Sequence, residues 1–152
     1  MSENKIKVIK LNTFNPELTL NKGIYTKIKP SLSEKKEIIK GINELKKINS
    51  YNHTQAVIIR DNKVISRETR KGTKVMIKSV TKSKIKKGIL IKLPKIEQDL
   101  RVDLPTIGID TFKDCNEVGI KGIVIKSNQN IILNKKACIK YANQNKLFLI
   151  AI

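Results

Sequence analysis

Two β-branched runs stand close together at residues 54–60 (TQAVIIR) and 63–68 (KVISRE). Only Asp61 and Asn62 separate them, and residues of this kind favour the tight turn that joins two antiparallel strands. The stretch therefore predicts a β-hairpin over residues 54–68. We expect this hairpin to be the central element of a sheet.

Upstream of the hairpin the pattern changes from strand-like to helical. Ser31 and Glu34 stand three residues apart and predict a capping box at the start of a helix. The helix is expected to run to about residue 48, because its large apolar residues fall on one stripe, as in a helix that covers a sheet. Those residues are Ile38, Ile42, Leu45 and Ile48. Nearer the start of the chain, residues 6–9 (IKVI) predict a first strand.

Downstream of the hairpin, short apolar runs alternate with helical patterns. Gly72 opens a segment whose apolar residues suit a short amphipathic helix, namely Val75, Met76, Val80 and Ile85. Strands are predicted at residues 88–93, 123–125, 131–133 and 147–150, and further helices at residues 110–118 and after Asn134. The alternation indicates an α/β fold, in which a single compact domain has a mixed sheet with helices packed on it.

The chain of 152 residues carries a formal net charge of +19, which ordinarily points to nucleic acid or an anionic membrane. Of its 32 basic residues only four are arginine, and tryptophan is absent. The residues that bind phosphates through paired hydrogen bonds and those that stack on bases are therefore scarce. A small basic nucleic-acid-binding protein, using the lysine belt at residues 70–95, remains the alternative interpretation of the sequence.

Membrane spans, secretory signals and zinc sites are not indicated. No apolar run reaches the roughly 18 residues that a span requires, and residues 1–5 lack the apolar core of a signal peptide. Cys115 and Cys138 have no Cys-x-x-Cys spacing, so both are interpreted as free thiols. His53, the only histidine, is interpreted as a loop residue. We expect a soluble, cytoplasmic protein.

Acidic residues gather in one part of this lysine-rich chain. Residues 69–96 contain no acid, whereas six acids follow within residues 97–117. The segment from Asp99 to Leu104 alternates polar and apolar residues, which predicts an extended segment with Asp99, Arg101 and Asp103 on one face. Such carboxylates can share a hard cation or orient water, but the same pattern also fits an exposed structural ladder.

A second candidate site precedes this acidic run. Gly72 and Thr73 follow the hairpin, and a glycine at a strand-to-helix turn allows a phosphate to approach the backbone and the Thr73 hydroxyl. The pair is equally consistent with a turn glycine and a helix cap. Glu68 and Gln55 can line the same edge of the hairpin, or each can be a solvated strand residue.

The order of these residues resembles a known hydrolase family, the LpxI type of UDP-2,3-diacylglucosamine pyrophosphatase from lipid A biosynthesis. Three motifs carry the likeness most strongly, KLPK at residues 92–95, QDLRVDLPTIG at residues 98–108 and DT at residues 110–111. Weaker matches are GIYT at residues 23–26, QAV at residues 55–57, Glu68 with Gly72-Thr73, GIKGI at residues 119–123 and LF at residues 147–148.

The resemblance implies a Mg²⁺-assisted hydrolysis of UDP-2,3-diacylglucosamine, in which water attacks a phosphorus of the pyrophosphate and releases lipid X and UMP. It implies catalytic and metal-binding roles for Asp103 and Asp99, with Glu68 as a further metal ligand. The implied substrate-binding residues are Gln98, Arg101, Thr106, Thr111, Lys92, Gly72, Thr73 and Gln55.

The resemblance covers nearly the whole chain but only the carboxy-terminal half of that family. It implies that residues 1–152 form the catalytic carboxy-terminal domain and that the amino-terminal domain is a missing partner. A lipid-linked substrate is also compatible with peripheral contact at the inner face of the inner membrane. One departure concerns Gly72-Thr73, which the family flanks with acids and this chain flanks with Lys71 and Lys74.

Overall fold

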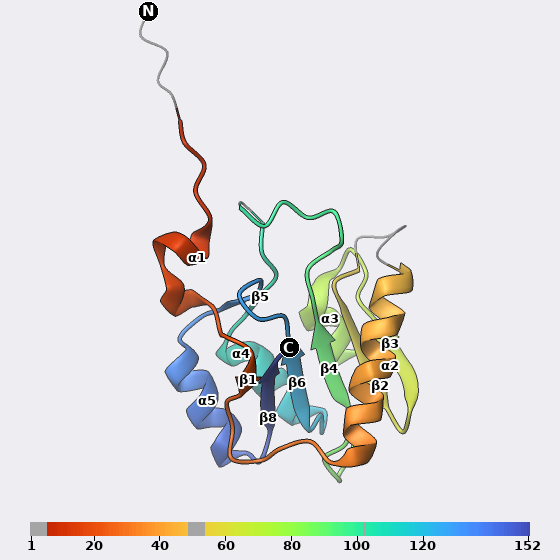
Figure 1. Cartoon of the computed structure of the whole chain (residues 1–152). Helices are drawn as coiled ribbons and strands as arrows, with labels where there is room; N and C mark the ends of the chain where they lie inside the picture. Colours follow the sequence, from red (N-terminus) through yellow and green to blue (C-terminus); the bar gives the residue numbers. More distant parts are fainter. Residues whose placement is uncertain (1–5, 49–53, 102) are drawn as a thin grey trace, which may run out of the picture.

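The computed structural model describes residues 6–48, 54–101 and 103–152, and these form a six-stranded mixed sheet with helices on both faces (Figure 1). The strands of this sheet are β1 (Gly23–Ile24), β2 (Ala56–Arg60), β3 (Lys63–Arg67), β4 (Ile89–Lys92), β6 (Gly122–Ile125) and β8 (Phe148–Ala151). A smaller sheet pairs β5 (Thr106–Ile107) with β7 (Ile131–Ile132). The helices are α1 (Leu11–Phe14), α2 (Leu32–Ile48), α3 (Gly72–Lys78), α4 (Ile109–Glu117) and α5 (Lys135–Gln144), with a 3₁₀ turn η1 at Pro16–Leu18. The predicted α/β fold class is confirmed.

The order of strands in the sheet is β1-β8-β6-β4-β2-β3. Strands β8, β6 and β4 are parallel to one another, while β1, β2 and β3 pair antiparallel with their neighbours. The carboxyl ends of β4, β6 and β8 therefore lie along one edge of the sheet, which we call the carboxyl edge. Because β2 runs the other way, its first residue Ala56 pairs with Lys92 and lies at this same edge.

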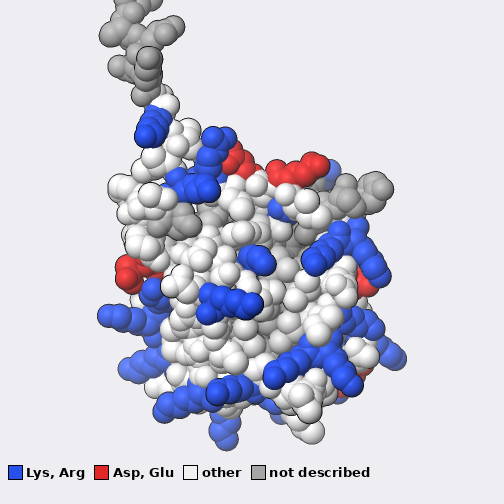
Figure 2. Space-filling model, viewed as in Figure 1, with Lys and Arg blue, Asp and Glu red and all other residues white. Residues whose placement is uncertain are grey.

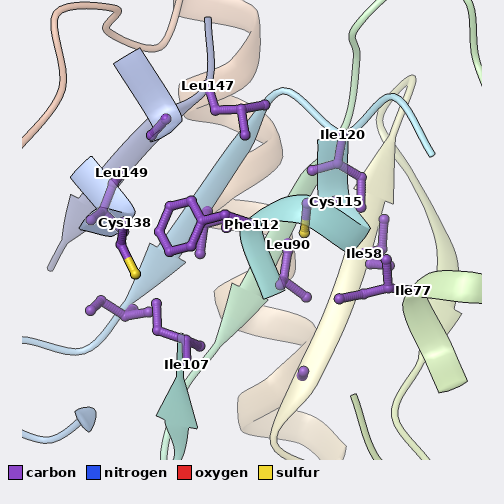
Figure 3. Packing of buried hydrophobic residues seen from close by; sticks show 14 of the residues in the cluster. Ile58, Ile77, Leu90, Ile107, Phe112, Cys115, Ile120, Cys138, Leu147 and Leu149 are labelled. Atoms are coloured by element: carbon purple, nitrogen blue, oxygen red, sulfur yellow. The ribbon is translucent and has the colours of Figure 1, made fainter. Parts of the chain in front are cut away.

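The sheet separates two apolar cores. Alternate strand residues, including Ile58, Leu90 and Leu149, face α3, α4 and α5, where they enclose Phe112 and Cys115 (Figure 3). The intervening residues form the second core, which α2 covers with its apolar stripe. Its members include Val57, Ile59, Ile91, Val124, Phe148, Ile38 and Leu45. Both faces of the inner strands are thus buried, as parallel sheets require.

The predicted hairpin is confirmed, and its turn explains the residues found there. Asp61 and Asn62 have φ angles of 51° and 57°, the left-handed conformation that a two-residue hairpin turn needs at both positions. Its position was predicted wrongly, because β3 is an edge strand of the sheet and the hairpin lies at one end. The centre is occupied by β4 and β6, whose pairing is long-range and leaves no local signal.

The start of α2 also agrees with the prediction. The Glu34 carboxylate accepts a hydrogen bond from the Ser31 backbone N–H at 2.7 Å, and the Ser31 hydroxyl accepts one from the Glu34 N–H at 3.2 Å. Burial raises the pKa of Glu34, but the Lys121 ammonium at 2.7 Å and the Ser31 donors more than offset this and lower it overall. The capping box is therefore tied to the loop before β6 as well.

Two predictions about regular structure are wrong. Residues 6–9 form no strand, and Ile6, Val8 and Ile9 are exposed on a segment that leads away from the domain (Figure 1). The position beside β8 is taken by β1, and residues 6–9 pair with no strand among the described residues. Ile85 is 76% exposed and lies beyond the end of α3. The predictions for residues 1–5 and for His53 concern parts outside the described residues.

Cys115 and Cys138 are both buried free thiols, as predicted. Burial raises the pKa of Cys115 far above its usual range, and burial likewise raises the pKa of Cys138 to about 11. Both side chains therefore pack as small apolar groups. Within the described ranges, no helix combines the length and apolar character needed to cross a membrane.

Gly122 is where β6 receives the Phe148 ring of β8. A Cβ atom added at Gly122 would lie 2.0 Å from two ring carbons of Phe148, and that ring is fully buried. We expect Gly122→Ala to lower the free energy of unfolding by about 1–3 kcal/mol, since overpacking forces the ring out of place. Urea unfolding of both proteins measures this change.

The matched control is Gly23→Ala in β1, where an added Cβ meets its nearest atom, of the Tyr25 ring, at an ordinary 3.8 Å. An unfolding curve for Gly122→Ala that overlays the Gly23→Ala curve would show that the Phe148 ring moves at no cost.

Candidate functional site at the carboxyl edge of the sheet

Four predicted site residues form one hydrogen-bonded network at the carboxyl edge. The Lys92 ammonium, at the end of β4, donates to the Thr73 hydroxyl at 2.7 Å. Thr73, in the first turn of α3, donates in turn to one carboxylate oxygen of Glu68. The other Glu68 oxygen accepts from the backbone N–H of Gln55 at 2.9 Å. The β2–β3 hairpin brings Gln55 and Glu68 together, and the β2–β4 pairing adds Lys92.

The two charged side chains of the network are buried, which sets its electrostatics, whereas Gln55 and Thr73 are half-buried. Lys92 and Glu68 are only 9% and 8% exposed. Burial lowers the pKa of the Lys92 ammonium, and the negative charge of Glu68 partly opposes that shift. A buried cation held by one hydroxyl and one nearby carboxylate is a suitable partner for an anion that reaches this edge.

Gln98 lies in the loop after β4 and links this loop to the network. Its side-chain oxygen accepts from the Gln55 side-chain amide at 2.8 Å and from the Lys95 backbone N–H at 2.9 Å. Its side-chain nitrogen Nε2 is buried and has no hydrogen-bond partner among the described residues. A buried donor left without an acceptor is costly, so the Gln98 side chain is held in this position at a cost in stability.

Asn130 was not predicted, yet it fixes the backbone of Lys92. Its side chain is fully buried, donates to the Lys92 carbonyl at 3.1 Å and accepts from the Lys126 N–H at 2.9 Å. These two hydrogen bonds link the carboxyl end of β4 to the residue that follows β6. The sequence places Asn130 only in a polar turn, and its role depends on the β4–β6 pairing.

The acidic run does not form the predicted extended segment. The Asp103 N–H donates to the Asp99 carbonyl at 2.9 Å, which closes a turn within an exposed loop. The Arg101 guanidinium binds the Asp99 carboxylate through two bonds of 3.0 and 2.9 Å. The alternating pattern was misleading because none of the described strands pairs with this segment, and the attraction between Asp99 and Arg101 is satisfied locally.

The remaining predicted residues lie outside the network. Asp103 is exposed, and its carboxylate has no partner among the described residues. The Thr106 hydroxyl donates to the Leu104 carbonyl at 3.2 Å. Thr111 accepts from the Gly108 N–H at 3.4 Å as part of the start of α4. Gly72 has a φ of +86°, so it supplies the left-handed turn that leads into α3.

Figure 2 shows how charge is distributed over one face of the molecule. Acidic side chains gather at the top, where the loop after β4 lies in Figure 1, while lysine and arginine side chains are spread over the rest of this face. Across the described ranges, no three His, Cys, Asp or Glu side chains are grouped so that they could hold a metal ion. Asp99, Asp103 and Glu68 therefore do not form a ready-made three-ligand centre.

The ion pair between Asp99 and Arg101 can be detected through the pKa of Asp99. Hydrogen bonds from the Arg101 side chain and backbone, together with its charge, lower the pKa of Asp99 from 3.8 to about 2. We expect Arg101→Gln to raise this pKa toward 3.8, since the charged donor is lost. Carboxyl ¹³C titration of both proteins by NMR measures it. An unchanged Asp99 midpoint would mean that the ion pair is absent in solution.

Comparison with known proteins supports the likeness noted in the sequence. Residues 21–150 match the family described as LpxI C-terminal domain. A relative, the UDP-2,3-diacylglucosamine pyrophosphatase LpxI of Caulobacter vibrioides, is 28% identical over 144 residues, which cover 90% of this chain and 51% of the relative. The chain thus spans about half the length of that relative. It belongs to the LpxI C-terminal domain family.

Proposed function

We propose that this chain carries the hydrolytic site of an enzyme of lipid A biosynthesis that cleaves the pyrophosphate of UDP-2,3-diacylglucosamine into lipid X and UMP. Family membership and the name of the Caulobacter vibrioides relative support the reaction. The observation that carries the proposal is the buried Lys92–Thr73–Glu68 network beside a loop that bears an unpartnered carboxylate.

The residues of the carboxyl edge divide into two kinds of role. Lys92 offsets charge on the pyrophosphate, and Thr73 and Gln98 offer neutral hydrogen bonds to its oxygen atoms. Glu68 acts as the acceptor that holds Thr73 and keeps Lys92 charged, because both of its oxygens are already engaged. Asp103 is left as the carboxylate that orients the attacking water or holds a cation.

A magnesium ion fits the donor set of the loop better than it fits the buried network. Mg²⁺ in phosphate-cleaving sites takes one or two carboxylates and completes its shell with water and substrate oxygens. Asp103 can supply such a ligand directly, whereas Asp99 must first release Arg101. When bound, the ion would neutralise charge on the pyrophosphate oxygens. Glu68 shares Thr73 with the Lys92 ammonium, so a second cation is disfavoured there.

The test is release of UMP from UDP-2,3-diacylglucosamine by the purified chain, with Mg²⁺ and with EDTA in its place. We expect release that depends on Mg²⁺ and yields lipid X in equal amount. The other half of the longer relatives is the proposed partner domain, so the assay is repeated with that half added as a separate chain. Absence of UMP in both assays would refute the proposed reaction.

A further inference from the structure

A pocket of about 440 Å³ opens at the carboxyl edge, between the last turns of α2 and the loop after β4. Apolar side chains make up most of its lining, with Ile42 and Leu45 from α2, Leu93 and Pro94 after β4, and Leu100 from the acidic run. A concave apolar surface of this size is the usual form of a small-molecule site. None of the proposed catalytic carboxylates lines it.

The rim of this pocket is cationic. Lys46, Lys95 and Lys126 line it, and the described residues of the lining include no aspartate or glutamate. Gln98 also lines it. Ile96, also in the lining, is 65% exposed and extends the apolar surface toward solvent. An apolar interior under a positive rim matches a ligand with an alkyl chain and a negatively charged head.

We infer that this pocket holds an alkyl chain of an anionic amphiphile, with Lys46, Lys95 and Lys126 facing its charged oxygen atoms. This deepens the proposed function, on which it rests for the view that the substrate is such a molecule. Gln98 connects the two sites, since it lines the pocket and also binds Gln55 of the polar network.

The first experiment measures binding of octyl, decyl and dodecyl phosphate by calorimetry, each below its micelle concentration and without Mg²⁺. Burial of each added methylene is expected to tighten binding about fourfold until the pocket is filled. Inorganic phosphate is expected not to bind measurably, and dodecyl maltoside to bind more weakly than dodecyl phosphate. Affinity that does not change with chain length would overturn the inference.

Two variants test the location of the site. Leu100→Glu puts a charge against the alkyl chain from a loop position, and we expect it to weaken dodecyl phosphate binding about tenfold or more. Replacing Lys46, Lys95 and Lys126 together by glutamine removes the rim charge, with an expected loss on the order of tenfold. The control for the first is Ile39→Glu, an exposed residue of α2 outside the pocket, and for the second Lys36→Gln.

Circular dichroism and thermal unfolding establish that each variant is folded before its affinity is compared. Binding unchanged by Leu100→Glu would place the alkyl chain elsewhere and overturn the inference. The UMP assay is kept separate, because alkyl phosphate binding requires no turnover. A chain that binds dodecyl phosphate in this pocket but releases no UMP would support the pocket and refute the proposed reaction.

Discussion

Asp103→Ala is expected to lower the rate of UMP release by about 10²- to 10⁴-fold, the range found when a group that positions a proton or a water is removed. The physical reason is that Asp103 carries an exposed carboxylate with no partner in the described structure, so it is free to act on water or a cation. UMP release at saturating Mg²⁺ measures the effect for both proteins.

Its control is Glu97→Ala, which removes another exposed acid of the same loop and should leave the rate nearly unchanged. Asp99→Ala is compared alongside, since Asp99 is bound by Arg101 and is the less available of the two aspartates. Equal rates in Asp103→Ala and the unmodified chain would remove Asp103 from the mechanism. Dodecyl phosphate affinity should be retained in all three variants, which separates loss of chemistry from loss of binding.

Arg60→Met is expected to lower the free energy of unfolding by about 3 kcal/mol, because the guanidinium is buried and supports a long loop. It donates to the backbone carbonyls of Lys87, Thr81 and Val118 at 3.2, 2.8 and 3.1 Å. Hydrogen bonds from a charged donor are worth more than neutral ones, and buried carbonyls left without a donor add a penalty. Urea unfolding measures the difference.

The control is Arg67→Met on the neighbouring strand, an exposed arginine paired with Glu44, with an expected change of at most about 1 kcal/mol. Burial lowers the pKa of Arg60, opposed by Asp61, yet a guanidinium remains charged at neutral pH. The loss should therefore be the same from about pH 6 to pH 8. A loss no larger than that of Arg67→Met would show that the loop holds its conformation without these bonds.

The elements that the sequence predicts well are those specified by neighbouring residues. The Asp61-Asn62 turn and the Ser31–Glu34 capping box depend on residues at most a few positions apart, so both are recognisable before the fold is known. The prediction of a strand at residues 6–9 failed because an apolar pattern does not show whether the chain returns to the sheet; the position beside β8 is taken by β1, and residues 6–9 lead away from the domain (Figure 1). Whether an apolar run pairs with another strand depends on residues far away in the sequence.

The candidate site shows the same difference between features set by nearby residues and features set by distant ones. Gln55, Glu68, Thr73 and Lys92 were predicted from motifs and lie together in the structure. The acidic run was predicted to be extended because its polar and apolar residues alternate. None of the described strands pairs with it, and it forms a loop with turns instead. Asn130 could not be predicted, since its partner Lys92 lies 38 residues away and across a parallel pairing.

The pairing of β1 with β8 has a consequence for how the protein is made. Gly23 pairs with Ala151, and the Leu149 N–H donates to the Thr26 hydroxyl at 3.0 Å across 123 residues. During synthesis, β1 therefore has no partner until the last strand has emerged, and closing such a distant contact is slow. Ribosome-bound chains that stop before residue 147 should leave the region around Gly23 open to protease while the β2–β3 hairpin is already protected.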